Sequence, residues 1–320
     1  MSMGDVERVE GYFSADSVTW EVLTAPATAL MIAQITNLLE VPHLDFQSVL
    51  LDHDPLFPTN AKRQRGRRAR RRKAGHFHDR LRRTLSVPLP IVFGDKEAAV
   101  ACANHLFDYH RPMSGVGPDG ATRYSATAPE AMLFAAVTIT HAALLAYERF
   151  AFRDGEPPRR LDPARRDRYF AEMAQLAILM GVPAADIPIS SAQVADYYAE
   201  IGEKFATRPG FRLAQLRTAA ALMIPDSRAD LGRTLADLGL MASALLAYAA
   251  LPRPSRRLHG VPAFCDPLLA ALRLISLPGF ALLSVPAVGE AALRWYLGAA
   301  DTEMLTGARS RIGKTSARVA

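Results

Sequence analysis

The most constraining feature of this sequence is a long apolar segment near its middle, PEAMLFAAVTITHAALLAYERF, at residues 129–150. Its alanine- and leucine-rich composition favours a helix, and a helix that is apolar all round belongs in a protein core or in a membrane. Two threonines and His141 interrupt the run, which favours the centre of a helical bundle over a membrane span. The following Tyr147-Glu148-Arg149 indicates that the helix ends in water. The His141 imidazole is then either a hydrogen-bonded core histidine or a ligand.

Further alanine- and leucine-rich segments predict an all-α fold, since half of the residues are hydrophobic and only 8% are aromatic. The expected helices lie at 24–38, 95–110, 162–181, 191–205, 211–224 and 229–251. We expect one domain, a bundle of roughly ten helices over residues 16–300. The ends, 1–15 and 301–320, are expected to be flexible.

Nothing in the composition predicts a membrane or secreted protein. Six prolines between residues 252 and 286 interrupt the apolar helices, so we expect no span of about twenty residues there. The two cysteines, Cys102 and Cys265, lack metal-site spacing and indicate no disulfide framework. The polar, acidic start differs from a signal peptide, and a cytoplasmic protein is the simplest inference.

Residues 62–73, KRQRGRRARRRK, hold nine basic side chains and no acid, and without them the remaining charge is slightly negative. Such a run repels itself and predicts a solvated loop that takes no part in the chemistry. No aromatic residue offers a stacking platform for bases, so we expect no specific nucleic-acid partner. The run could still attract an anionic membrane surface.

A candidate site lies in the stretch from residue 76 to residue 110. Arg80, Arg83 and Thr84 precede an apolar span, and Asp95 is a suitable N-cap for the helix that follows. On that helix His110 falls on the face that also carries alanines and a leucine. A buried imidazole there is either a core histidine bonded to a carbonyl or a ligand, and spacing alone favours the core histidine.

Several motifs in this order resemble the MpaB and latex-clearing-protein (rubber oxygenase) family. They are RLRRTLSVPLPIVFGD, YHRPMSG, a Tyr-Ser-Ala turn, PEAMLFA with LLAYERF, and RDRYFAEMAQLAILMGVP, and they spread over roughly residues 28–200. A weaker similarity, ALRWYLG, lies near Arg294. The resemblance implies an all-α protein with a globin-like core that holds haem b. The characterised members include oxygenases that cleave carbon–carbon double bonds of isoprenoid chains.

The resemblance also assigns roles to single residues. His110 stands where the family has its haem-iron ligand, which makes ligation the favoured interpretation, with His141 as the reserve ligand. Arg80, Arg83 and Thr84 match an Arg-x-x-Lys/Arg-Thr group over the opposite face of the haem. They would stabilise negative charge that develops on dioxygen, the arginines as cations and Thr84 as a hydrogen-bond donor. Because arginine is a poor iron ligand, the sixth iron position would be open or water-filled.

Three positions depart from the family pattern. Ala136 and Asn37 stand where many members have a histidine, and Ser114 stands where arginine is frequent. The expected function is therefore a haem b-dependent oxygenase, an oxidoreductase that acts with dioxygen on a lipophilic, isoprenoid or otherwise unsaturated substrate. The alternative is a helical binding or scaffold protein, with or without haem, that lacks oxygenase activity. The sequence leaves the substrate and the oligomeric state open.

Overall fold

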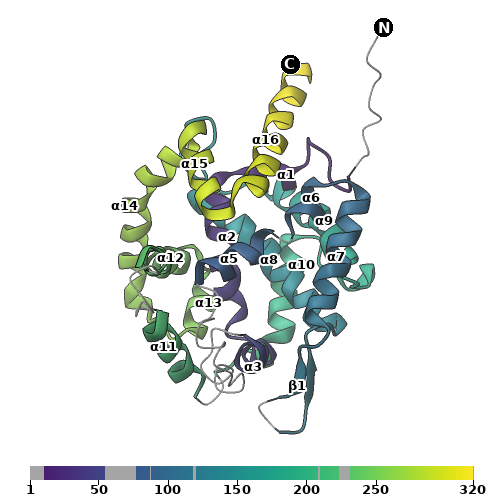
Figure 1. Ribbon diagram of the computed structural model, residues 1–320, viewed down its shortest axis with the longest axis vertical. Helices are drawn as coiled ribbons and strands as arrows, with labels where there is room; N and C mark the ends of the chain where they lie inside the picture. The colour runs from purple at the N-terminus through teal and green to yellow at the C-terminus, as the bar shows by residue number, and fades with distance from the viewer. Residues whose placement is uncertain are drawn as a thin grey trace.

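A computed structural model describes residues 11–54, 77–86, 88–117, 120–207, 210–222 and 231–319 and confirms the all-α fold (Figure 1). Its α-helices are α1 (Val18–Thr24), α2 (Pro26–Glu40), α3 (Leu44–His53), α5 (Phe77–Ser86), α6 (Leu89–Phe93), α7 (Lys96–His110), α8 (Pro129–Phe150), α9 (Pro163–Leu179), α10 (Ser191–Glu200), α11 (Phe211–Leu222), α12 (Leu231–Ala250), α13 (Arg253–Leu258), α14 (Asp266–Ser284), α15 (Pro286–Leu297) and α16 (Ala299–Val319). Short 3₁₀ turns lie at Ala184–Asp186, Ile201–Lys204 and Ala263–Cys265. The only strands in these ranges, β1 (Ser114–Val116) and β2 (Arg123–Ser125), form an antiparallel hairpin.

Helices α2 and α8 form the centre of the molecule and pack along each other, as Figure 1 shows. Nearly all of α2 is buried, and α8 buries Ala142, Ala143 and Ala146 completely. Small side chains let two helix backbones approach closely, so the alanines fix this pair at the densest part of the core. Gln34, the polar side chain in the middle of α2, donates to the Ser243 hydroxyl of α12 at 2.6 Å.

The helices begin at the capping residues that the sequence indicates. Asp95 accepts a hydrogen bond from the Ala98 amide at 2.7 Å, and Asp162 accepts one from the Arg165 amide at 2.9 Å. Ser190 caps α10 in the same way. Each cap satisfies an amide that the first helical turn leaves without an intrahelical partner.

The C-terminal end of α8 differs from the expectation that Tyr147-Glu148-Arg149 meets water. Tyr147 and Glu148 are buried, because the chain after α8 and helix α9 fold back over them. Glu148 accepts from the Leu161 amide at 3.0 Å and pairs with Arg166 at 3.2 Å, so its charge is compensated inside the core.

Residues near both ends of the described chain pack against the bundle. Phe13, in the segment expected to be flexible, is buried in the core. After residue 300 the chain forms helix α16, whose buried residues Thr302, Leu305 and Ala308 recur every three positions. This spacing places them on one face against the bundle. The basic run at 62–73 lies outside the described residues.

Helix α14 overturns the expectation that prolines prevent a long apolar helix in the last third. Pro278 lies inside α14, and the helix continues through it to Ser284. By length and composition alone, α8 and the segment Ala263–Ser284 could each cross a membrane, and the bent pair α1 and α2 could be a third span. Two thirds of the α8 window is buried in the core, as expected, but only 11% of the Ala263–Ser284 window is buried.

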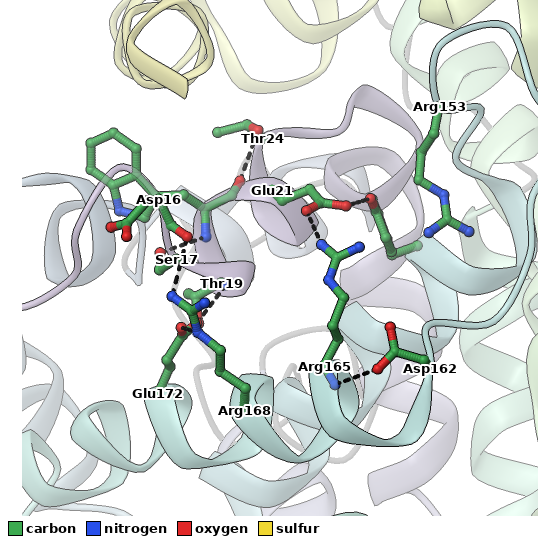
Figure 2. A network of polar contacts seen from close by, with 12 residues as sticks. Asp16, Ser17, Thr19, Glu21, Thr24, Arg153, Asp162, Arg165, Arg168 and Glu172 are labelled. Atoms are coloured by element: carbon green, nitrogen blue, oxygen red, sulfur yellow. Dashed lines mark hydrogen bonds and ion pairs between the residues drawn. The ribbon is translucent and has the colours of Figure 1, made fainter. Parts of the chain in front are cut away.

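A polar network joins α1 to α9 and fixes the N-terminal helix on the bundle (Figure 2). Glu172 of α9 accepts from the Thr19 amide at 2.9 Å and from Arg168 at 2.8 Å. Glu21 of α1 pairs with Arg165 and accepts from the Tyr147 hydroxyl. Helix α1 is therefore connected to both α8 and α9 through charged side chains at the edge of the core.

We expect Glu148→Ala to lower the free energy of unfolding by about 3–5 kcal/mol, because it leaves the nearly buried Arg166 guanidinium without its partner. Urea unfolding followed by circular dichroism measures the loss. The control is Glu290→Ala, which removes an exposed ion pair with Arg294 and should cost less than about 1 kcal/mol. Equal losses in the two variants would contradict a special role for the Glu148 cluster.

Candidate functional site

A cavity of about 1090 Å³ opens among α2, α3, α5, α7, α8 and the β-hairpin. This volume lies at the upper end of the roughly 300–1,000 Å³ range of small-molecule and cofactor sites. Its lining is mostly apolar on the α8 side, with charged and imidazole side chains from α2, α3, α5 and α7 opposite. The apolar residues from α8 and α9 include Met132, Leu133, Phe134, Ala135, Ile139, Leu176 and Met180.

Helix α5 carries three of the predicted site residues, and contacts from distant parts of the chain hold it in place. The Asp237 carboxylate of α12 accepts from the His78 amide at 2.8 Å, at the N-terminal end of α5. The His78 ring lies 3.0 Å from the Tyr296 carbonyl and stacks on Trp295 of α15. Leu81 is buried in the core on the inner side of the helix. The opposite side of α5 is thereby presented to the cavity.

Arg80, Arg83 and Thr84 all line the cavity. Arg80 forms an ion pair with Asp54 at 2.7 Å and donates to Asn37 at 3.0 Å, so its guanidinium is fixed on two sides. Arg83 is more exposed and donates to the Asp79 carbonyl of its own helix. The Thr84 hydroxyl donates to the Arg80 carbonyl at 3.1 Å, so its proton is engaged in the helix.

His110 also lines the cavity, at the last residue of α7. Its Nδ1 lies 2.8 Å from the Leu106 carbonyl. A proton on Nδ1 that donates there leaves the lone pair on Nε2, which is the arrangement of most metal-ligating histidines. Burial lowers the pKa of this imidazole, and the bond to Leu106 opposes the shift only in part. The neutral form, the one that can act as a ligand, is therefore favoured.

Several other cavity residues were not singled out by the sequence analysis. His53 lines the cavity, and Asp54 pairs with Arg80. The sequence did contain an indication that His53 and Asp54 belong to a site, because they directly follow an apolar segment. His43, between α2 and α3, lines the cavity as well, with its ring packed against Phe134 at 4.3 Å. Burial lowers the His43 pKa to about 4, and its Nδ1 has no hydrogen-bond partner among the described residues.

The β-hairpin closes one side of the cavity because it is fastened to α3. The Tyr124 hydroxyl donates to Asp52 at 2.7 Å, and His53 Nε2 lies 3.2 Å from the Ser114 carbonyl. Gly115 permits this arrangement, because a Cβ at that position would lie within 3 Å of the Tyr124 ring. Tyr124 and Arg123 are thereby placed in the cavity wall.

Glu40 is the cavity carboxyl with the most perturbed acidity. It lies at the C-terminal end of α2, where the Thr138 hydroxyl of α8 donates to it at 3.0 Å. Burial raises its pKa to about 7, although the Thr138 bond and the Arg80 charge act in the opposite direction. A carboxyl with this pKa exchanges its proton near neutral pH. The cavity therefore contains a proton-exchanging group beside the α5 arginines.

His141, the reserve ligand, does not line this cavity. Its Nδ1 lies 3.4 Å from the Tyr198 hydroxyl, and its ring packs against Phe170 and Tyr198. Ala136 likewise does not line the large cavity, and it lines a separate void of about 10 Å³. Asn37, the second departure from the family pattern, instead holds Arg80.

Among the described residues, no group of three or more His, Cys, Asp or Glu side chains is placed to hold a metal ion. What the cavity does offer is His110 among its lining histidines, together with the lining cations Arg80, Arg83, Arg123 and Lys204. These cations favour an anionic ligand.

Comparison with known protein families gives one match. Residues 58–281, well over half of the chain, match the family described as "ER-bound oxygenase mpaB/B'/Rubber oxygenase, catalytic domain". The match includes α5, α7, α8 and α9 and extends past residue 200, where the sequence resemblance was expected to end. No curated protein and no solved structure matches the chain.

The half-buried His141 generates a prediction about stability at acidic pH. Burial, and then the Arg166 charge, lower its pKa from 6.5 to about 4, so between these values the unfolded chain binds more protons than the folded one. The stability that the neutral His141 contributes to the folded state is fully present above pH 6.5 and is lost as the pH falls toward 4. We expect His141→Gln to flatten the pH dependence of the unfolding free energy in this window by up to about 1.4 kcal/mol per pH unit. Urea unfolding from pH 7 to pH 4.5 measures it, and an unchanged slope would contradict the neutral, half-buried imidazole.

Proposed function

This chain belongs to the mpaB and rubber-oxygenase family, and on that premise we propose that it is a haem b-dependent oxygenase acting on a lipophilic, unsaturated substrate. The observation that carries the proposal is His110. It ends α7 in the wall of a large cavity, with Nδ1 held by the Leu106 carbonyl and Nε2 left as the ligating nitrogen.

The residues present fit a haem. A b-type haem needs one protein ligand to its iron, an apolar slot for its ring and partners for two carboxylates. His110 supplies the ligand, and Met132, Phe134 and Ile139 of α8 supply apolar wall. Arg123 and Lys204 are lining cations that could pair with the carboxylates.

When bound, the haem would supply the redox chemistry by which dioxygen is activated. The protein's own contribution is electrostatic. Arg80, fixed by Asp54 and Asn37, is a preorganised cation, and such a group stabilises negative charge without having to reorient. Glu40, with a pKa of about 7, could accept or return a proton in the same cavity.

The substrate class follows from the cavity's lining. A wall of methionine, leucine, isoleucine and phenylalanine side chains recognises shape and hydrophobicity and offers no hydrogen bonds to a polar substrate. A hydrocarbon chain with a double bond would bind there because binding removes its apolar surface from water. The cations and acids on the opposite side would remain available for dioxygen and protons.

We expect His110→Ala to bind at least about tenfold less haem than the wild type while keeping its helical circular dichroism. The measurement is the Soret absorbance per protein after purification from haem-replete cells. His141→Ala is the control, since that histidine lies outside the cavity and should leave the Soret band unchanged. A colourless wild-type protein would instead support the alternative of a haem-free binding protein. A normal Soret band in His110→Ala would show that His110 is not the ligand.

We expect Arg83→Ala to keep haem content near the wild-type level but to slow substrate oxidation by about 10- to 1,000-fold. Arg83→Lys retains the positive charge and should recover part of the rate. The neighbouring Arg82→Ala is the control, because Arg82 is exposed and is not among the cavity-lining residues. Haem-normalised turnover with dioxygen measures the effect. Loss of haem in Arg83→Ala would mean that Arg83 binds the haem carboxylates.

A further inference from the structure

Helix α14 and the residues that flank it expose a continuous apolar strip, which we call the α14 face. It consists of Phe264, Pro267, Leu268, Ala271, Leu274, Ile275, Pro278, Gly279, Leu282 and Val285. At about 100° per residue these positions fall within an arc of roughly 140°, over a length of about 30 Å. Ile275 is 77% exposed and Phe264 81% exposed, which is unusual for side chains of this kind on a folded protein. Figure 1 shows α14 along the outer edge of the molecule.

The opposite side of α14 is firmly attached to the bundle, so the α14 face is a fixed outer surface. Phe280 is buried and stacks on Phe150 of α8 with ring centres 4.6 Å apart. Arg273 donates to the Arg149 carbonyl, and Asp266 pairs with Arg256 of α13 at 2.8 Å. Both charged residues of α14, Asp266 and Arg273, are therefore engaged with the rest of the protein. The helix could not rotate to bury the exposed strip without breaking these contacts.

The α14 face offers a partner almost no hydrogen bonds. Every exposed residue between 262 and 288 is apolar, from Pro262 to Val288. The two serines of the helix are half-buried, and each donates to its own helix, Ser276 to the Arg273 carbonyl and Ser284 to the Ala281 carbonyl. Protein–protein interfaces carry about one hydrogen bond per 100–200 Å². A surface without donors or acceptors instead suits hydrocarbon, which has none.

Neighbouring helices extend this surface and give it a charged border. Helix α12, packed beside α14, exposes Leu235, Gly239, Ala242 and Leu245 at helical spacing. Next to the start of α14, the short helix α13 exposes Arg257 and Arg253, the latter also paired with Asp266 at 2.8 Å. After its end, α15 exposes Trp295, at 56%, and Arg294, which pairs with the exposed Glu290 at 2.9 Å. Arginine and tryptophan at the edges of an apolar surface are the residues that lie at the headgroup level of a bilayer.

From this geometry we propose that the α14 face docks into one leaflet of a lipid bilayer, with α14 lying along the membrane surface. The apolar strip would enter the boundary of the acyl chains, and the flanking arginines would meet the lipid phosphates. The other side of α14 stays packed on α8 and α13, so the helix lies on the membrane and does not cross it. This docking is independent of haem binding and of the proposed oxygenase activity.

Flotation of the full chain with phosphatidylcholine vesicles tests the proposal. These vesicles carry no net charge, so attraction of basic residues contributes little and the apolar surface dominates. We expect the wild type to float with the vesicles and Leu268→Glu/Ile275→Glu to partition at least tenfold less. Ile178→Glu/Ile189→Glu is the matched control, because it places the same charges on exposed isoleucines of α9 and the segment before α10. The control should float like the wild type.

A second measurement does not depend on a disruptive substitution. The fluorescence that Ile275→Trp adds to that of the two native tryptophans should be quenched by lipids brominated on their acyl chains, whereas the fluorescence that Ile178→Trp adds should not be. Three results would overturn the proposal. They are a wild type that fails to float, a Leu268→Glu/Ile275→Glu variant that floats like the wild type, or a non-floating wild-type dimer that this variant converts to a monomer. The last result would assign the α14 face to a second copy of the chain.

Discussion

The packing of α2 against α8 is the contact on which the rest of the structure depends. Both helices are buried along most of their lengths, and fully buried alanines on α8 bring the two backbones close together. Where α2 ends, Glu40 meets Thr138 and His43 packs on Phe134, so the end of this contact is also the wall of the cavity. A tightly packed pair has little freedom to relax, and this rigidity fixes the position of the cavity's apolar side.

Contacts from distant parts of the chain position the polar side of the cavity. Helix α5 is short, yet α12 caps its first turn through Asp237 and α15 holds His78 through a carbonyl and an indole ring. Arg80 is then fixed by Asp54 and Asn37, which come from two further segments. Five separate parts of the chain thus determine where one guanidinium lies. Such convergence lowers the reorganisation needed when charge develops in the site.

Helices α8 and α14 are nearly equally apolar, but the fold buries α8 and leaves one side of α14 exposed. Helix α8 is enclosed by its neighbours, and its only acidic side chain in the core, Glu148, has two arginines as partners. Helix α14 is covered on one side and leaves a wide apolar strip at the surface. The molecule therefore has two apolar regions of different kinds, a closed cavity wall suited to a lipophilic ligand and an open face suited to a lipid surface.

The sequence by itself determined the helical class, the starts of the helices at Asp95 and Asp162, and the placement of His110 on an inward face. These properties depend on composition, capping and periodicity, which are local. Only the tertiary structure decided that His43, His53 and Asp54 join the α5 residues, that His141 does not, and that Glu148 is buried. It also decided that α14 continues through Pro278 and stays exposed. Convergence and burial depend on which distant segments pack together, and no periodicity within one segment specifies its neighbours.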